Sequence, residues 1–156
     1  MSPTLTALVA QYGYAAALLA TISEGETVLM VCGAMAQRGV FDLPVLYTIG
    51  AIGAVLPDNT LFAVGRTLGV ARLRRWPRFA RAVDRANSVI ARYPRASVIA
   101  MRFMYGTRLA GPAIIGCGRL PWWRFALLDA FAAGLWAFSW VNAGYAVSLA
   151  AFTNLS

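Results

Sequence analysis

The last part of the chain is its longest apolar stretch. PWWRFALLDAFAAGLWAFSWVNAGYAVSLAAF, residues 121–152, contains only two charged residues, Arg124 and Asp129. A helix of about 20 apolar residues crosses a bilayer with its backbone groups paired internally. Residues 121–152 therefore predict a spanning helix, with Trp122 and Trp123 at the lipid–water boundary. Asp129 lies about one turn inside, where we expect it to pair with Arg124 or to stay at the interface.

The other apolar stretches are shorter or interrupted. Residues 5–22 have near-minimal spanning length, so they either span or form one arm of a hairpin. The apolar run 27–36 is only ten residues long, which is typical of a re-entrant segment. Residues 43–65 can cross, although Pro57 predicts a kink or interruption there. After Pro94 no uninterrupted stretch reaches spanning length, which predicts a second re-entrant hairpin.

The two halves of the chain follow the same order: short hairpin, glycine-rich return, spanning helix. Glycines recur at an offset of about 80 residues, although a fixed period among many glycines is weak support alone. The matches are Gly33 with Gly116, Gly53 with Gly134, and Gly65 with Gly144. If the connecting segment is cytoplasmic, the hairpins enter from opposite sides. The predicted fold is therefore an all-α polytopic membrane protein, an inverted repeat with two opposed re-entrant hairpins plus spanning helices.

Positive charge is concentrated between the two halves. All 14 basic residues are arginines, which with 6 acidic residues gives a net charge of +8. Nine lie within residues 66–95: Arg66, Arg72, Arg74, Arg75, Arg78, Arg81, Arg85, Arg92 and Arg95. The positive-inside rule places such a segment in the cytoplasm. We expect it to form amphipathic helices that are broken near Pro77 and lie at the interface. Its arginines would attract anionic lipid headgroups. We therefore expect no nucleic-acid partner. Hydrophobic residues make up 60% of the chain, compared with about 45–50% of a soluble domain. This composition predicts a single membrane domain over residues 1–156.

This sequence lacks the residues that several kinds of catalytic and metal site require. There is no histidine or lysine, and neither a GxSxG nor a P-loop motif. We expect no enzyme activity, cofactor or metal. Cys32 and Cys117 lack a CxxC spacing and are interpreted as small buried residues, with a disulfide left open. The N-terminus has no basic region or small-residue cleavage site, so the first apolar segment is expected to be retained.

Two arginines lie six residues apart in the apolar stretch MRFMYGTRLAGPAIIG, residues 101–116. An arginine at the centre of a membrane helix costs roughly 2.5 to 3.5 kcal/mol, so Arg102 and Arg108 are functional candidates. One continuous helix would separate them by about 240°, but Gly106 and Pro112 predict a break that lets them converge. Guanidinium groups and exposed backbone N–H groups bind phosphate. The predicted anion-binding residues are Arg102, Arg108, Thr107, Gly106 and Gly111.

Carboxylates complement these arginines. Glu24 and Glu26 lie in SEGE, where an unwound tip would turn both toward one cavity; the alternative is a solvated turn or a helix N-cap box. Asp58 either carries a proton or caps the helix that resumes after Pro57. The predicted proton-coupling residues are Glu26, Asp58 and Glu24. In a further alternative, Arg102 or Arg108 pairs with Glu26 only to hold the hairpins together.

These motifs resemble those of the DedA family (SNARE-associated, VTT-domain) of membrane proteins, in order and over nearly the whole chain. RFMYGTR with its glycine-rich return is similar to the family's RFxPGTR pattern, EGETVLMVCGAMAQRG to its PGE or PSE pattern, and PDNTLFAVGRTLG to its GDxxxYxxGRxxG pattern. Tyr105 replaces a proline of that pattern, Glu24 another proline, Pro57 a glycine and Phe62 a tyrosine. From the resemblance, we expect the chain to lack the family's last C-terminal helix.

The resemblance implies residue roles and a function. By position, Glu26 and Asp58 take the acidic roles, Arg102 and Arg108 are the paired arginines, and Gly65-Arg66 ends the first spanning helix. The implied function is lipid translocation in a bacterial inner membrane, most directly of polyprenyl (undecaprenyl) phosphate, linked to the proton-motive force and supporting the cell envelope. Expected partners are membrane lipids and protons, with a homo-oligomer left open. The alternatives are a proton-coupled exporter of small ions and a structural or assembly factor.

Overall fold

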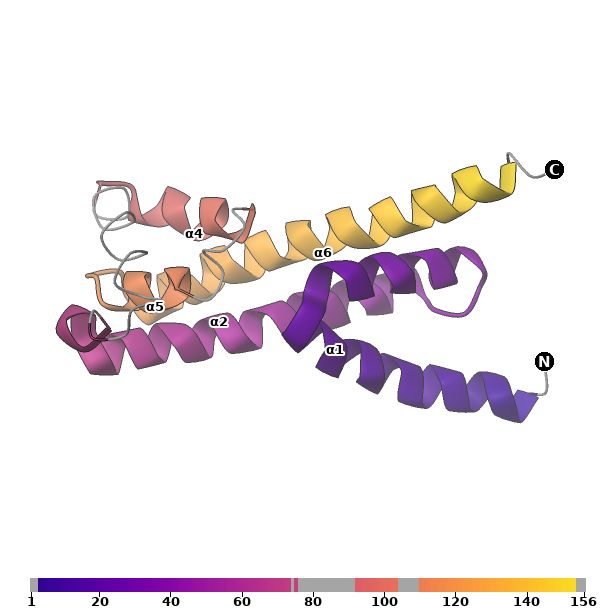
Figure 1. Cartoon of the computed structure of the whole chain (residues 1–156), viewed down its shortest axis with the longest axis horizontal. Helices are drawn as coiled ribbons and strands as arrows, with labels where there is room; N and C mark the ends of the chain where they lie inside the picture. Colours follow the sequence, from indigo (N-terminus) through magenta and orange to yellow (C-terminus); the bar gives the residue numbers. More distant parts are fainter. Residues whose placement is uncertain (1–2, 74, 76–91, 104–109, 154–156) are drawn as a thin grey trace. The chain divides into compact units, whose positions relative to one another are not determined.

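The computed structural model describes residues 3–73, 75, 92–103 and 110–153. Regular structure in this part of the chain is entirely helical (Figure 1): α1 (Pro3–Gln37), α2 (Leu43–Leu73), α4 (Pro94–Phe103), α5 (Gly111–Gly116) and α6 (Trp122–Thr153). Two segments are long and apolar enough to cross a membrane, Leu43–Gly69 of α2 and Trp122–Thr153 of α6. The predicted all-α class is confirmed, and α6 closely matches the predicted helix.

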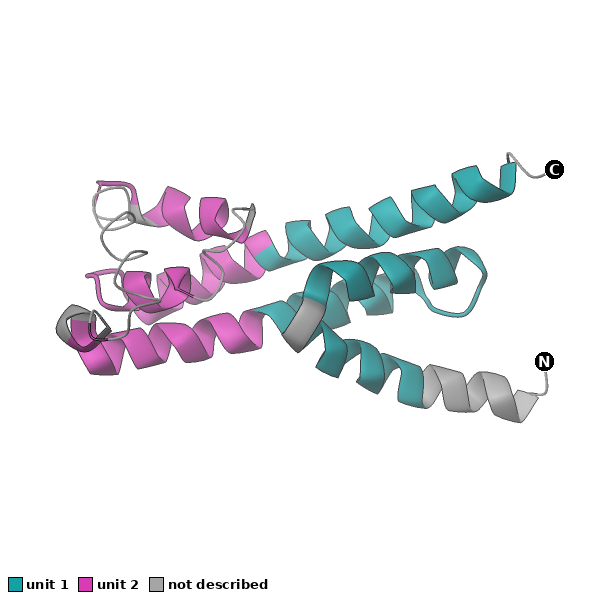
Figure 2. Cartoon of the chain, viewed as in Figure 1, with its two compact units in different colours: residues 1–54, 133–156 teal, residues 55–132 magenta. Residues whose placement is uncertain are grey.

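The chain divides into two compact units (Figure 2). Unit 1 contains residues 1–54 and 133–156, and unit 2 contains residues 55–132. Both boundaries fall inside long helices. Unit 1 therefore consists of α1, the start of α2 and the end of α6, whereas unit 2 consists of the rest of α2, α4, α5 and the start of α6.

Within unit 1, α1 folds back on itself. The Tyr14 hydroxyl accepts a 2.9 Å hydrogen bond from the backbone N–H of Asp42, and the Tyr14 ring packs 5.0 Å from that of Phe41. A straight helix would place Tyr14 roughly 35 Å from Gln37, farther than the short connection after α1 and a tyrosine side chain can reach. The ribbon of α1 changes direction accordingly in Figure 1. The two arms predicted on either side of SEGE are therefore present.

Residues 23–26 lie inside α1. The predicted unwound tip is therefore wrong, and so is the alternative of an N-cap before a new helix. Gly25 is buried, and in apolar surroundings an unwound backbone leaves N–H and C=O groups without partners. A bend that keeps helical hydrogen bonding avoids that cost.

Of the kink or interruption predicted at Pro57, the interruption is absent. The backbone of α2 stays helical through Pro57 and departs from helical angles at Gly69, with φ 72° and ψ 165°. Proline removes one backbone hydrogen bond, a loss that membrane helices tolerate, whereas a positive φ favours glycine. The helix does not end at Gly65-Arg66 either, but continues to Leu73.

Most of the predicted basic segment, residues 66–95, lies outside the described residues. At its start, Arg66 belongs to α2 and donates hydrogen bonds to the backbone carbonyls of Gly118, at 2.7 Å, and Leu120. Its guanidinium also lies 5.2 Å from the centre of the Phe62 ring. Pro94, near the end of the segment, begins α4. The prediction of interfacial amphipathic helices in this segment concerns mainly residues 76–91, which lie outside the described part of the chain.

In unit 1, α1 and α6 cross at two glycines. A methyl group on Gly33 of α1 would overlap the backbone carbonyl of Val141. A methyl group on Gly144 of α6 would overlap that of Met30. Small residues allow helix backbones to approach this closely, so the two glycines set the crossing.

In unit 2, α2 and α5 cross in the same way. Gly65 of α2 faces the backbone carbonyl of Ala113, and Gly116 of α5 faces that of Phe62, each with no room for a methyl group. The crossing again requires one glycine from each helix.

Two of the three glycine matches in the sequence thus mark corresponding contacts. Gly33 and Gly116 occupy the same place in their crossings, and so do Gly65 and Gly144. The third match fails, because Gly53 packs on Thr21 whereas a methyl group on Gly134 would meet no described atom within 4 Å.

The core of unit 2 lies among α2, α4, α5 and α6. Phe62 stacks on Phe125 with ring centres 4.4 Å apart, and around them are Val98, Met101, Ala110, Ala113, Ile114, Ile115 and Leu120. α4 ends one residue after Arg102 and α5 begins at Gly111. Most of the residues between them, including Gly106, where the break was predicted, lie outside the described part of the chain.

The two cysteines are free thiols. Cys32 is buried in unit 1, as predicted for a small packing residue. Cys117 is half-buried and donates a 3.1 Å hydrogen bond to the backbone carbonyl of Gly65. Cys117 therefore fastens the end of α5 to α2.

Candidate functional site

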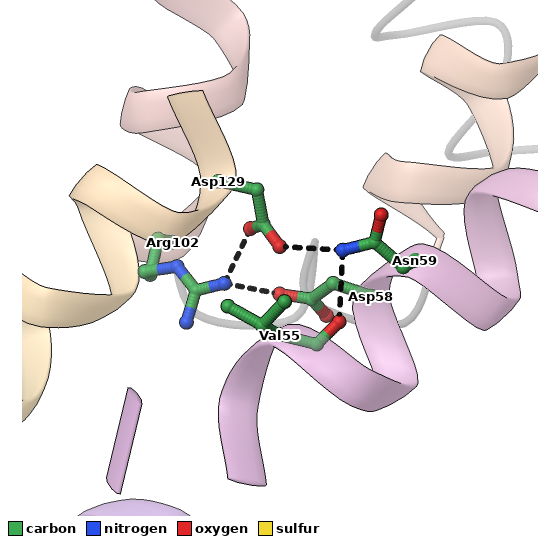
Figure 3. Close-up of polar contacts among 5 residues, drawn as sticks. All are labelled: Val55, Asp58, Asn59, Arg102 and Asp129. Carbon is green, nitrogen blue, oxygen red and sulfur yellow. Dashed lines mark hydrogen bonds and ion pairs between the residues drawn. The ribbon is translucent and has the colours of Figure 1, made fainter. Parts of the chain in front are cut away.

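Three buried charged residues meet in unit 2. Asp58 of α2, Arg102 of α4 and Asp129 of α6 point toward one another (Figure 3), and their exposed fractions are 6%, 8% and 2%. A single nitrogen, Nη2 of Arg102, donates hydrogen bonds to Oδ2 of Asp58 and Oδ1 of Asp129. Arg102 lies in the last turn of α4, so the end of this helix reaches both long helices. We call Asp58, Arg102 and Asp129 the triad.

Asn59 and Trp122 extend the hydrogen bonding toward the surface. The Asn59 side-chain nitrogen donates to Oδ2 of Asp129 at 3.3 Å and to the backbone carbonyl of Val55 at 3.0 Å. Trp122, 59% exposed, donates its indole N–H to Oδ1 of Asn59 at 3.0 Å. An indole nitrogen can only donate, so this bond fixes which end of the amide is the oxygen. Asn59 therefore presents donor hydrogens to Asp129.

The charges of the triad do not balance. When all three groups are ionised, two carboxylates and one guanidinium give a net charge of −1. Burial of an ion costs several kcal/mol, which an opposite charge offsets only when the two are paired. One additional proton makes the cluster neutral. Arg102 is thus engaged by two carboxylates through a single nitrogen.

The other amino group of Arg102, Nη1, is buried and has no hydrogen-bond partner among the described residues. In Figure 3 it points away from Asp129. A cavity of about 10 Å³ adjoins the triad, lined by Asp58, Val98, Met101, Arg102, Pro112, Phe125 and Asp129. One water molecule needs about that much space, and it can accept from a guanidinium and donate to a carboxylate. A phosphate group is too large for this cavity.

Asp129 is the site residue that sequence reasoning missed. We expected it to pair with Arg124 or to stay at the interface, but it is buried and bound by Arg102. Arg124 instead is exposed and lies 4.9 Å from the centre of the Trp123 ring. A usable signal existed, because a carboxylate in an apolar helix of spanning length is a functional candidate by default.

The predicted anion-binding residues have different outcomes. Arg102 belongs to the triad and pairs with Asp58 and Asp129, whereas the alternative considered from the sequence named Glu26 as its partner. Gly111 is buried at the start of α5, where a methyl group would overlap the thioether of Met101. Three others lie outside the described residues: Gly106, Thr107 and Arg108.

The predicted proton-coupling residues fall in both units. Asp58 is in the triad of unit 2. Glu26 is half-buried in α1 of unit 1. The side chain of Glu24 lies outside the described part of the chain.

Comparison with known proteins places the chain in a family. The family model of the VTT domain matches residues 22–146. Inner membrane protein YohD of Escherichia coli (strain K12) is 38% identical over 142 residues, which cover 91% of this chain and 74% of that protein. Two further relatives are 28% identical: uncharacterized membrane protein slr0232 of Synechocystis, over 91% of this chain and 70% of its own length, and uncharacterized membrane protein ML0287 of Mycobacterium leprae, over 82% and 59%.

No solved structure matches the chain. The relatives are named as membrane proteins, in agreement with the two helices of spanning length and composition. The match of the VTT domain to most of the chain agrees with the motifs in the sequence. This chain is therefore a helical membrane protein that belongs to the VTT-domain (DedA) family.

Proposed function

We propose that this protein translocates a phosphate-bearing lipid across a bacterial inner membrane and couples that movement to a proton. The observation that carries the proposal is the buried triad of two carboxylates and one guanidinium, two of whose members lie on helices of spanning length. Ionisable groups inside membrane segments mark ion pathways and proton relays. We propose a multi-pass transporter rather than an enzyme, and polyprenyl phosphate is the first substrate to test.

The triad divides the predicted residues into two groups. Arg102 is bound by two carboxylates, which leaves Arg108 as the arginine that we assign to the lipid phosphate. Gly106, Thr107 and Gly111 complete this anion-binding group through backbone N–H groups. Proton coupling is assigned to Asp58, with Glu26 and Glu24 as acids of the first hairpin.

We further propose that the two units form an inverted repeat with opposed re-entrant hairpins. The support is the repeated crossing, with Gly33 and Gly144 in unit 1 and Gly116 and Gly65 in unit 2. Inverted repeats in transporters place substrate and coupling-ion sites near the bilayer midplane.

A proton-coupled exporter of small ions is the second candidate. The cavity beside the triad, about 10 Å³, favours it, because that space suits a water-sized species and not a phosphate. A structural or assembly role is the third candidate, in which the arginines only pair with carboxylates.

Purified protein reconstituted in vesicles tests these candidates. We expect parent protein to move labelled polyprenyl phosphate faster when a proton gradient is imposed. Arg108→Ala should abolish the movement, and Asp58→Asn should remove its dependence on the gradient. Arg119→Ala is the matched control, because Arg119 is an exposed arginine just after α5. Lipid movement by Arg108→Ala at the parent rate would refute the lipid assignment.

The alternatives are separated in the same vesicles. Gradient-driven release of trapped small cations without lipid movement would favour the ion exporter. Exchanging the charges of Glu26 and Arg108 tests the structural role, because a purely structural pair tolerates reversal whereas a phosphate site does not.

A further inference from the structure

The triad satisfies only one of the two amino groups of Arg102. Nη2 donates to Asp58 and Asp129. Nη1 is, among the described residues, the one buried side-chain nitrogen or oxygen atom without a hydrogen-bond partner. The Arg102 side chain is 4% exposed, and a guanidinium does not lose its proton inside a protein. Buried polar atoms in folded proteins are almost always paired, with protein or with ordered water, so Nη1 calls for a partner.

A cavity beside the same side chain can hold that partner. Arg102 and both aspartates of the triad contribute to its wall. The rest of the wall is apolar and consists of Val98, Met101, Pro112 and Phe125. The cavity measures about 10 Å³, and one water molecule requires about 10–15 Å³. A donor and carboxylate acceptors therefore surround a space of the size of one water molecule.

The bonds that the aspartates already make do not exclude a water molecule. An ionised carboxylate has about four acceptor positions on its two oxygens. Either aspartate can therefore accept from water in addition to its bond with Arg102. A water that accepts from Nη1 and donates to a carboxylate makes two hydrogen bonds, within the range of two to about four found for buried waters.

The alternative is a dry cavity. It leaves N–H groups of a charged side chain without hydrogen bonds, and this loss is larger for charged groups than for neutral ones. Fixing one water molecule costs entropy, but many ordered waters lose little. The balance favours an occupied cavity.

We propose that one ordered water molecule occupies this cavity, accepts a hydrogen bond from Nη1 of Arg102 and donates one to a carboxylate of the triad. The inference goes beyond the proposed function and does not rest on it. With the water in place, both amino groups of Arg102 are bound, Nη2 by the aspartates and Nη1 by the water. The water is then a fourth member of the polar cluster to which α2, α4 and α6 contribute.

A crystal structure of the purified full chain tests the inference directly, at a resolution that shows ordered water elsewhere in the protein. We expect a density peak in the cavity within about 3.2 Å of Nη1 of Arg102. This measurement needs no substitution, so it does not depend on whether a variant folds. An empty cavity, a lipid or detergent chain inside it, or a protein atom bound to Nη1 would overturn the inference.

Val98→Ile tests the same point through stability. Val98 lines the cavity and is 3% exposed, so the added methyl group should take the place of the water. Filling a dry cavity should raise the unfolding temperature in detergent. Displacing a water leaves Nη1 of Arg102 unpaired and should lower that temperature by roughly 3 °C or more. We expect the lower temperature, and a higher one would contradict the inference.

The crystal structure of Val98→Ile distinguishes displacement of the water from overpacking. After displacement, the density peak should be absent and the neighbouring side chains should keep their places. Overpacking would instead shift Pro112 or Phe125 and retain the peak, which would still place a water on Nη1.

Neither measurement requires transport. Absence of lipid movement would refute the proposed function and leave the water in place. Conversely, a dry cavity would refute this inference and leave the proposed function standing.

Discussion

Units 1 and 2 share a helix crossing but differ in what lies beside it. In unit 2, Asp58 lies two helical turns before the crossing glycine Gly65. In unit 1, the residue two turns before Gly144 is Ala137, which is fully buried. The same shift along the sequence takes Gly50 to Asp129.

In each unit, the two residues at these corresponding positions lie near one another. Asp58 and Asp129 meet on Arg102, whereas Gly50 lies against the side chains of Ala137 and Leu29. The glycines therefore set how closely the backbones approach, and the residues beside them decide whether the space is ionic or apolar. The helix crossing is therefore repeated in the two units, whereas the charged residues beside it are not.

The largest expected effect comes from removing the cation of the charged unit. Arg102→Gln removes the counter-charge that Arg102 supplies to two buried carboxylates, which should lower the free energy of unfolding by about 3 to 5 kcal/mol. Thermal or denaturant unfolding in detergent measures this. Arg95→Gln on the exposed side of α4 is the control, and an equal loss in both variants would mean that the triad contributes no stability.

The shared crossing should respond alike in both units. Gly65→Ala and Gly144→Ala each force a methyl group onto a backbone carbonyl and should each cost about 2 kcal/mol. Gly134→Ala adds its methyl group to open space in a helix and should be neutral or slightly stabilising. If only one crossing variant is destabilised in unfolding measurements, the crossings are not equivalent.

A smaller loss of stability is expected in unit 1, where apolar side chains lie at the positions that correspond to the charged residues of unit 2. A methyl group on Gly50 would lie 2.9 Å from the Cβ of Ala137 and 3.0 Å from a methyl of Leu29. Gly50→Ala should therefore cost about 1 kcal/mol, because side chains yield more readily than backbone. If Gly50→Ala is as stable as Gly134→Ala, the contact of Gly50 with Ala137 and Leu29 is looser than described.

The smallest effect concerns the outer end of the charged network. Trp122→Phe removes the hydrogen bond to Asn59 and should lower unfolding free energy by about 0.5 to 1 kcal/mol. Trp123→Phe, at 55% exposure beside it, is the control with no bond to Asn59. Equal unfolding temperatures for the two variants would exclude Trp122 from the network.

Much of the fold could be predicted from hydrophobic length and glycine spacing. Residues 121–152 anticipated α6, because a long apolar stretch is a local signal. The glycine matches were interpreted only as a sign of a repeat, and the crossings at Gly33, Gly65, Gly116 and Gly144 were found in the structure. The interruption considered at Pro57 and the unwound tip predicted in SEGE are absent, since the cost of unpaired backbone groups outweighed local helix-breaking tendencies.

The site was only partly predictable. Asp58 and Arg102 were identified because ionisable residues in apolar stretches are conspicuous. Their meeting with Asp129 depends on how α2, α4 and α6 pack, which no spacing within one helix encodes. Asn59 was missed because its role arises from two partners, Trp122 and Asp129, that are distant in the sequence.

The contacts of Arg66 have a consequence for how the protein assembles. α5 has only six residues, and a helix that short has no stability of its own in isolation. Its crossing with Gly65, together with the Arg66 guanidinium on the carbonyls of Gly118 and Leu120, is supplied by α2. Because synthesis proceeds from the N-terminus, α2 is already made when α5 emerges, so the earlier helix acts as the template on which the later one forms.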